Sequence, residues 1–149
     1  MSVLDDVLDW AETNWRLSQL AHGALPTGED GFERDVRIPD QLITDPADGT
    51  VQVPHVFAHD PVANVDPLLW GQMQSTVRIR FDLVAPESET QAEVDTRLQA
   101  FRALVAADPT LGGIVRTAWC STWGVIDSKA MQGSRFREGR AVLSAVFVE

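Results

Sequence analysis

A helix that stops abruptly between two strands is the feature that most restricts the fold of this chain. Apolar side chains recur at helical spacing over residues 91–107, which predicts an amphipathic helix. The helix is expected to stop at Asp108-Pro109, because the residue before a proline disfavours helical backbone angles. Pro109 then opens a short extra turn over residues 109–111, which Gly112-Gly113 releases. A helix placed in this way covers one face of the sheet formed by the strands on either side of it.

A second helix is expected at the N-terminus, over residues 2–20. Both helices begin with a capping-box pattern, Ser2 with Asp5 in the first and Thr90 with Glu93 in the second. The apolar residues of the N-terminal helix form an unusually wide stripe, so this helix is expected to contact a second partner as well as its own core. The stripe consists of Val3, Leu4, Val7, Leu8, Trp10, Ala11, Trp15 and Leu17.

Four strands are expected. The clearest is STVRIRFDLV at residues 75–84, where apolar and polar side chains alternate, so one face is predicted on the core and the other in a polar setting. Pro54 cannot donate to a strand ladder, so the strand that contains it is an edge strand or carries a bulge. The other strands are predicted at residues 51–59, 114–126 (bent at Gly124) and 140–148, with a further short strand around 34–38.

Turn-rich segments separate these elements. Residues 22–50 and 127–139 are predicted as extended loops, and residues 60–73 as a turn-rich link whose Leu68, Leu69 and Trp70 form an apolar knot. The expected fold class is α+β, with a mostly antiparallel sheet of about four strands packed against one long helix, plus the N-terminal helix and the long loops. The 149 residues are expected to form a single domain.

The charge balance is strongly acidic, with a net charge of −10 from 22 acidic and 12 basic side chains. Affinity for nucleic acid phosphates comes from Lys and Arg, so this balance argues against a protein that grips DNA or RNA. It is compatible with a conduit that repels a passing DNA backbone, and equally with acidity that only keeps the chain soluble. No apolar run approaches the ~18 residues that span a bilayer, and the acidic start MSVLDDVLDW predicts no export signal.

Catalytic chemistry has little support in the sequence. Neither a GxSxG elbow nor a glycine-rich phosphate loop is present. His55 and His59 lie on one face of a predicted strand but roughly 13 Å apart, too far for both to ligate one metal ion. The single cysteine, Cys120, is expected to be a small buried hydrophobic residue. The sequence therefore predicts no catalytic, cofactor-binding or metal-ligating residues.

Several of these segments, in this order, are similar to one family. The VPHVF strand, the charged strand RIRFDLVAP, the helix ending LVAADPTLGGIV and the terminal AVLSAVFV resemble the tail terminator (tail completion) proteins of long-tailed bacteriophages, over about residues 51–149. The resemblance implies a non-enzymatic structural protein of the virion, located in the neck region and assembled in the host cytoplasm. Such a protein forms a homohexameric ring that caps the tail tube, ends its polymerisation and joins the tail to the head.

The resemblance also implies partners and contact surfaces. The partners are other copies of the chain, the tail tube protein and the head-tail connector or neck proteins. Genomic DNA passes through the ring without specific binding, and neither a membrane nor a cofactor is involved. A ring that closes head to tail needs two different adhesive patches on each subunit. The candidate interface residues are Trp10 and Trp15 of the first helix, the exposed aromatic pair Trp119 and Trp123, and the basic residues Lys129, Arg135 and Arg137.

Other functions remain open from the sequence. The chain is also compatible with another head-tail connector or neck subunit, of a contractile particle or a gene transfer agent. From a different class, it is compatible with a small α+β ligand-binding protein or enzyme, in which His55 and the acidic loops line a pocket. A regulatory dimer is a third possibility. The oligomer size as a function of concentration separates ring, dimer and monomer.

Overall fold

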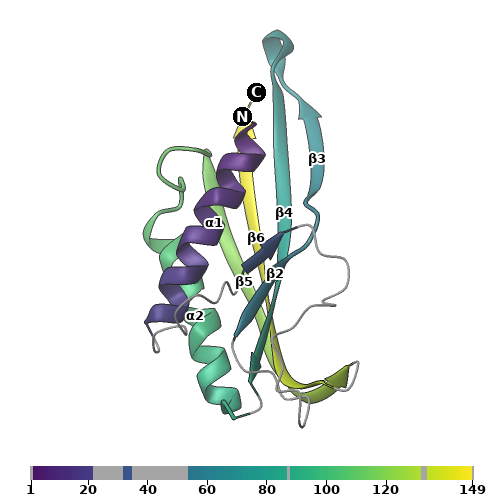
Figure 1. The fold of residues 1–149 in the computed structure, drawn as a ribbon. Helices are drawn as coiled ribbons and strands as arrows, with labels where there is room; N and C mark the ends of the chain where they lie inside the picture. Colours follow the sequence, from purple (N-terminus) through teal and green to yellow (C-terminus); the bar gives the residue numbers. More distant parts are fainter. Residues whose placement is uncertain (1, 22–31, 35–53, 87, 132–133, 149) are drawn as a thin grey trace.

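The computed structural model of the chain describes residues 2–21, 32–34, 54–86, 88–131 and 134–148. It confirms the predicted α+β fold, because two helices lie on one face of a mostly antiparallel sheet (Figure 1). The elements, in chain order, are α1 (Val3–Leu20), β1 (Phe32–Arg34), β2 (His55–Ala58), β3 (Val62–Pro67), the 3-10 turn η1 (Leu69–Gly71), β4 (Met73–Pro86), α2 (Gln91–Ala107), β5 (Thr117–Met131) and β6 (Ser134–Val148).

The long strand β4 organises the sheet. The strand order is β1-β2-β4-β6-β5, and all neighbours are antiparallel except the β1–β2 pair. β2 pairs with the C-terminal part of β4, and β3 pairs with the N-terminal part of the same edge. As a result, β3 and the start of β4 form a hairpin that extends past the strands around it (Figure 1).

The core lies between the helices and one face of the sheet. The apolar set of the alternating strand, Val77, Ile79, Phe81 and Leu83, is buried there as predicted. Trp15 of α1 stacks on Phe101 of α2 with ring centroids 4.2 Å apart, and its ring also tilts against Phe81 at 5.8 Å. This aromatic cluster joins both helices to the centre of the sheet and is the main contact that fixes their positions.

Both helices begin and end close to where the sequence predicts. The Ser2–Asp5 capping box is present in full, and Thr90 accepts a hydrogen bond from the Glu93 backbone N–H. α2 ends at Ala107, and residues 109–113 form a turn rather than a further helix. Three successive residues of that turn have positive φ: Leu111 (51°), which is fully buried, Gly112 (72°) and Gly113 (89°).

The buried Arg97 of α2 connects this helix both to the segment that precedes it and to the C-terminal end of α1. The guanidinium of Arg97 in α2 donates through Nε to both carboxylate oxygens of Glu89, each at 3.1 Å. Its Nη1 also donates to the backbone carbonyl of Gln19, at 3.2 Å, near the end of α1. Arg97 is only 7% exposed, so its charge depends on these partners for compensation.

Some predicted segments differ from the structure. Residues 60–73 are not a loose link, because β3 and η1 build a hairpin with β4 there. Most of residues 127–139 is not an extended loop, because β5 and β6 continue to pair up to Met131 and Ser134, with irregular register between Trp123 and Lys129. The register shift after Trp123 spans Gly124, where a bend was predicted. The short strand is β1 at Phe32–Arg34, and residues 35–38 lie outside the described part, as do most of residues 22–50 and residues 51–53.

Candidate assembly interface

The hairpin formed by β3, η1 and the start of β4, residues 62–78, is here called the hairpin arm. All six residues of β3 are exposed, among them Val62 and Val65. The backbone N–H of Leu68 donates to the carbonyl of Gln72 at 2.7 Å and closes the turn at its end. This turn, the hairpin tip, presents Leu69 and Trp70, which are 82% and 97% exposed. Large apolar side chains are thus placed at the far end of a projecting element (Figure 1).

The backbone at the hairpin tip is strained. Trp70 has φ 67° and ψ 30°, in the left-handed region that bulky side chains rarely adopt. Gly71 follows with φ 73°, where a glycine has no such penalty. Holding a non-glycine residue in this region costs about 1 kcal/mol or more, and strain of this kind concentrates at binding and switch segments. The tip is therefore a candidate contact site on conformational grounds as well as by its exposure.

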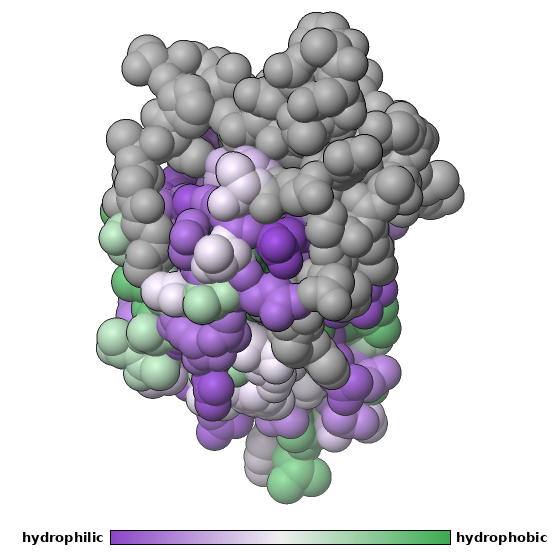
Figure 2. Space-filling model, turned by 90° about the horizontal axis from the view of Figure 1, so that it is seen from below, coloured by the Kyte–Doolittle hydropathy of each residue, from purple (hydrophilic) through white to green (hydrophobic). Residues whose placement is uncertain are grey.

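The end of the molecule opposite to the hairpin tip has a different character. Figure 2 shows it from below, with hydrophilic side chains over the centre of the coloured surface and hydrophobic ones towards the rim.

Exposed apolar residues occur singly on most soluble proteins and need no explanation, whereas a contiguous group marks a contact site. The sequence run Leu68, Leu69 and Trp70 at one turn is such a group.

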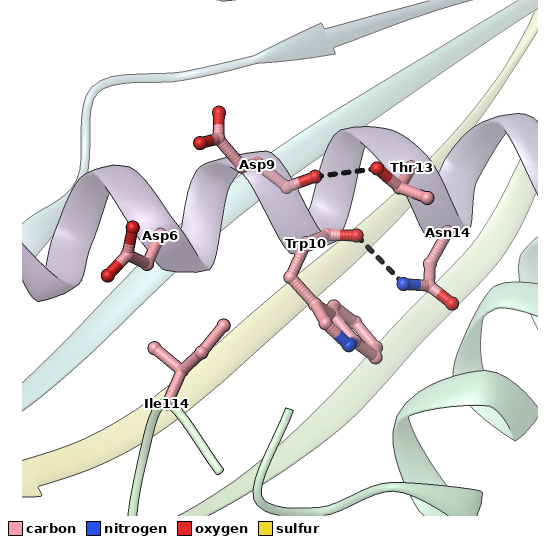
Figure 3. A pocket seen from close by; sticks show the side chains of 6 residues that line it. All are labelled: Asp6, Asp9, Trp10, Thr13, Asn14 and Ile114. Atoms are coloured by element: carbon pink, nitrogen blue, oxygen red, sulfur yellow. Dashed lines mark hydrogen bonds between the residues drawn. The ribbon is translucent and has the colours of Figure 1, made fainter. Parts of the chain in front are cut away.

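A second candidate surface is a shallow hollow of about 430 Å³ beside α1, here called the α1 groove (Figure 3). Trp10 and Ile114 give it apolar character, and both pack only partly against the core. The ring centroids of Trp10 and Phe101 lie 6.3 Å apart, and this contact fixes the position of the Trp10 ring. The groove is lined by Asp6, Asp9, Trp10, Thr13 and Asn14 of α1 and by Ile114, which follows the turn after α2.

The polar lining of the α1 groove consists mainly of hydrogen-bond acceptors. The Thr13 hydroxyl donates to the carbonyl of Asp9 at 3.0 Å, and the Asn14 side-chain amide donates to that of Trp10 at 2.8 Å (Figure 3). Asp6 lies in the first two turns of α1, where the helix dipole favours negative charge. The groove therefore suits an apolar group that carries a hydrogen-bond donor.

Asp9 also joins the groove to the sheet. Its carboxylate accepts a hydrogen bond from Arg34 of β1 at 2.6 Å, and Glu12 lies 3.5 Å from the same guanidinium. The hydrogen bond that Arg34 donates to Asp9, followed by the charges of Glu12 and Asp9, raises the pKa of Arg34, although burial opposes this shift. The ion pair holds β1 against α1 and positions one rim of the groove.

The face of the sheet opposite to the helices, here called the open face, carries a third candidate surface. Trp119 of β5 lies opposite Ser144 of β6 and is 46% exposed. Val142 and Val146 lie on the same face and are partly exposed. An antiparallel sheet tolerates a solvated face, so this surface alone does not demand a partner.

A compact polar cluster also lies on the open face. The buried carboxylate of Asp82 accepts hydrogen bonds from His59 Nε2 at 2.6 Å, from Arg80 at 3.1 Å and from Arg140 Nε at 3.0 Å. Two guanidinium groups and an imidazole around one carboxylate satisfy its lone pairs in the way that a structural buried charge requires. A His–carboxylate pair is also the kind of pair that acid–base catalysis uses, so this cluster is the part of the described structure that favours an enzyme.

The predicted interface residues fall into different environments. Trp10 lies in the α1 groove, and Trp119 is exposed on the open face. Trp15 is fully buried, so the structure places it in the core and not at a contact surface. Arg137 is half-buried, and its Nε is buried without a hydrogen-bond partner in the described part of the chain. The backbones of Trp123 and Lys129 lie in β5 and that of Arg135 in β6, whereas their side chains lie outside the described residues.

The hairpin arm is the candidate surface that the sequence prediction missed. Its signal was the run Leu68-Leu69-Trp70-Gly71 between two predicted strands, interpreted as an apolar knot instead of an exposed turn. Gly71 after Trp70 indicates a turn, but nothing local shows on which side of the fold that turn lies.

The remaining reactive side chains give no further site. Burial raises the pKa of the Cys120 thiol to about 12, opposed by the nearby charge of Arg102, so the thiol stays protonated at neutral pH. Within the described residues, no group of three His, Cys, Asp or Glu side chains is placed to hold a metal ion. His55, considered with His59 as a ligand pair, has its side chain outside the described part. Neither described helix is long and apolar enough to cross a bilayer.

Comparison with known proteins adds no relative. No protein-family model matches the chain, and no curated protein matches it at a significant level.

Proposed function

We propose that this chain is a structural subunit of a bacteriophage neck, of the tail terminator type. Copies of the chain form a ring, which we expect to be a homohexamer as in that family. The ring caps the tail tube, ends its polymerisation and joins the tail to the head connector. The observation that carries the proposal is the presence of two unlike apolar surfaces on one chain, the hairpin tip and the α1 groove. A ring that closes head to tail requires two such different patches per subunit.

The charge of the chain suits a passage for DNA. With a net charge of −10, a ring of such subunits repels the phosphate backbone and offers few cations to bind it. The proposed role therefore includes genomic DNA passing through the ring without specific binding. No cofactor, metal ion or membrane takes part in this role.

Capping follows from the geometry of strand edges. A growing tube adds subunits to an exposed edge, and a ring that pairs with this edge ends growth if its other face offers no equivalent edge. The hairpin arm carries an exposed strand, β3, whose six residues lie at one margin of the sheet. We assign contacts above and below the ring to such projecting segments, because loops and arms of a rigid domain reach furthest towards neighbours.

A second candidate is a different neck or connector subunit, which shares the same surface features and differs in its partner. A third is a small α+β ligand-binding protein or enzyme, and the observations that favour it are the α1 groove and the His59–Asp82 pair. Binding to tail tube ends distinguishes a tail terminator from another neck or connector subunit. The Asp82→Asn variant tests the third candidate, because an effect on ligand binding favours it and an effect on assembly favours a structural subunit.

The test is a tube-capping experiment. The tail tube protein encoded in the same genome is polymerised with and without this chain, and tube lengths and ends are measured by electron microscopy. The proposal predicts shorter tubes with a ring-shaped density at one end. Tubes of unchanged length with bare ends contradict it, and binding to connector protein under the same conditions points to the second candidate.

A further inference from the structure

We infer that the hairpin tip of one copy, Leu68 to Trp70, inserts into the α1 groove of a second copy of the same chain. The inference rests on the proposed function only in that this function requires head-to-tail assembly. It specifies which two surfaces meet, with the exposed indole of Trp70 as the anchor and the groove beside Trp10 as its receptor.

The hairpin tip has the properties of an anchor whose side chains are left exposed in the single chain. Trp70 is 97% exposed, and the neighbouring Leu69 is 82% exposed, so neither side chain gains much from its own domain. β6 pairs with β4 as far as Gln74, and the turn of the hairpin arm extends past that point (Figure 1). Exposed tryptophans that fill a partner's pocket supply a large part of the binding energy of protein interfaces. Trp70 lies in the turn itself and has a positive φ of 67°.

The α1 groove has the matching properties. Its volume of about 430 Å³ is in the range of concave sites that bury small organic groups. The exposed part of the Trp10 ring offers an aromatic partner, and aromatic pairs contribute beyond the area that they bury. Indole Nε1–H is a donor only, whereas Asp6 and the Asn14 side-chain oxygen on the rim are acceptors. The apolar and hydrogen-bonding character of the two surfaces is therefore complementary.

The chemistry of the hairpin arm favours a second copy over DNA or a lipid surface. The charged side chains of the hairpin arm are Asp66 and Arg78, and Arg78 lies at the base of the arm, so the tip carries no Lys or Arg. Binding to phosphates or to anionic lipid depends on such cations. A projecting tip and a groove on different parts of one chain also form the arrangement that joins identical copies head to tail.

Site-specific cross-linking tests the contact directly. In a Cys120→Ala background, one preparation carries Leu69→Cys at the hairpin tip and the other carries Thr13→Cys at the exposed rim of the groove. The two are mixed, with and without tail tube protein, and treated with a short bis-maleimide. The matched control replaces Thr13→Cys by Ser121→Cys, an exposed position on β5. We expect heterodimer in the first mixture at least tenfold above the control.

Equal cross-linking in the two mixtures, or none in either, overturns the inference. If ring-sized particles form nevertheless, the proposed function stands and only the contact surfaces are wrong. If the unmodified chain stays monomeric with and without tail tube protein, both the inference and the proposed function fail.

A substitution pair provides a second, independent test. Trp70→Asn removes the indole anchor and introduces asparagine, a residue that tolerates the left-handed conformation. We expect it to weaken self-association by at least about 30-fold in sedimentation or light scattering, the effect of losing a hot-spot residue. Ser121→Ala, at the exposed β5 position that also serves as the cross-linking control, should change self-association by less than threefold. The opposite ranking of the two variants overturns the inference. So does Trp70-dependent binding to phosphatidylcholine–phosphatidylglycerol vesicles with unchanged self-association, because it assigns the tip to lipid.

Discussion

Gly139 of β6 provides the sharpest test of how α2 packs on the sheet. It is buried under α2, and a Cβ atom placed on it would lie 2.7 Å from Leu98 Cδ1, 3.4 Å from Leu98 Cγ and 3.3 Å from Val94 Cγ1. Contacts between carbon atoms are optimal at about 3.5–4.0 Å, so either the helix or the Leu98 side chain has to move. Leu98 has 0% exposure, so its side chain cannot turn out into solvent.

The magnitude of a Gly139→Ala effect follows from two opposing contributions. Overpacking a core by one methyl group costs about 1–3 kcal/mol. Removing a glycine from a strand restores about 0.5–1 kcal/mol, because the unfolded chain loses less conformational freedom on folding. We therefore expect Gly139→Ala to lower the free energy of unfolding by about 1 kcal/mol.

The assay is a double-mutant cycle with Leu98→Ala, followed by urea denaturation and tryptophan fluorescence at a concentration where the chain is monomeric. Leu98→Ala alone should cost about 2–5 kcal/mol, because it leaves a cavity. In that background the added methyl group at position 139 no longer meets Leu98, so the overpacking cost should disappear while the gain from removing the glycine remains. The coupling energy should therefore equal the overpacking cost, about 1–3 kcal/mol. Additive effects of the two substitutions would refute the close packing of α2 on Gly139.

Four further outcomes are expected. Trp15→Ala should lower the free energy of unfolding by about 3–5 kcal/mol, measured by urea denaturation, because it removes the ring stacked on Phe101. Arg97→Met should cost about 3 kcal/mol in the same assay and less when combined with Glu89→Leu, because the single change leaves a buried carboxylate unpaired. Cys120 should react with a thiol reagent only after unfolding. Its pKa is about 12 in the folded state against 9.0 as the ordinary value, so the unfolded chain loses this proton first and the free energy of unfolding falls by about 1.4 kcal/mol per pH unit between these values. Trp70→Asn should leave the thermal midpoint of the monomer unchanged or raise it slightly, since it relieves strain without loss of a buried contact.

The sequence was sufficient to predict the elements that bury one face in the core and leave the other exposed. Both helices have an apolar stripe and a cap, and their bounds agree with the structure to within a residue or so. The alternation in β4 predicts its buried face because Ile79 and Phe81 meet the core at a period of two. Such periodicity is strong wherever one side of an element is buried and the other is not.

The sequence was insufficient where strands are stabilised by backbone pairing alone. β3 reads VANVDP, with Asn, Asp and Pro that disfavour strands, and none of its residues is buried, so no period marks it. Likewise, β5 and β6 continue as a pair through residues 127–131 and 134–139 because each supplies the other's backbone hydrogen bonds. The α1 groove depends on the approach of Ile114 to Trp10 across more than a hundred residues, which no local pattern encodes. The resemblance to tail terminators and the interface roles of Trp119, Trp123, Lys129, Arg135 and Arg137 stay predictions.

The measurement that tests the central claim most directly is the mass of the purified chain in solution. Light scattering over a range of concentrations, with and without tail tube protein, distinguishes a monomer of 16.4 kDa from a closed ring. Assembly as a tail terminator predicts a discrete mass near six times that of the monomer, reached either at high concentration or on tube ends. A monomer or dimer whose mass does not respond to tail tube protein would contradict it.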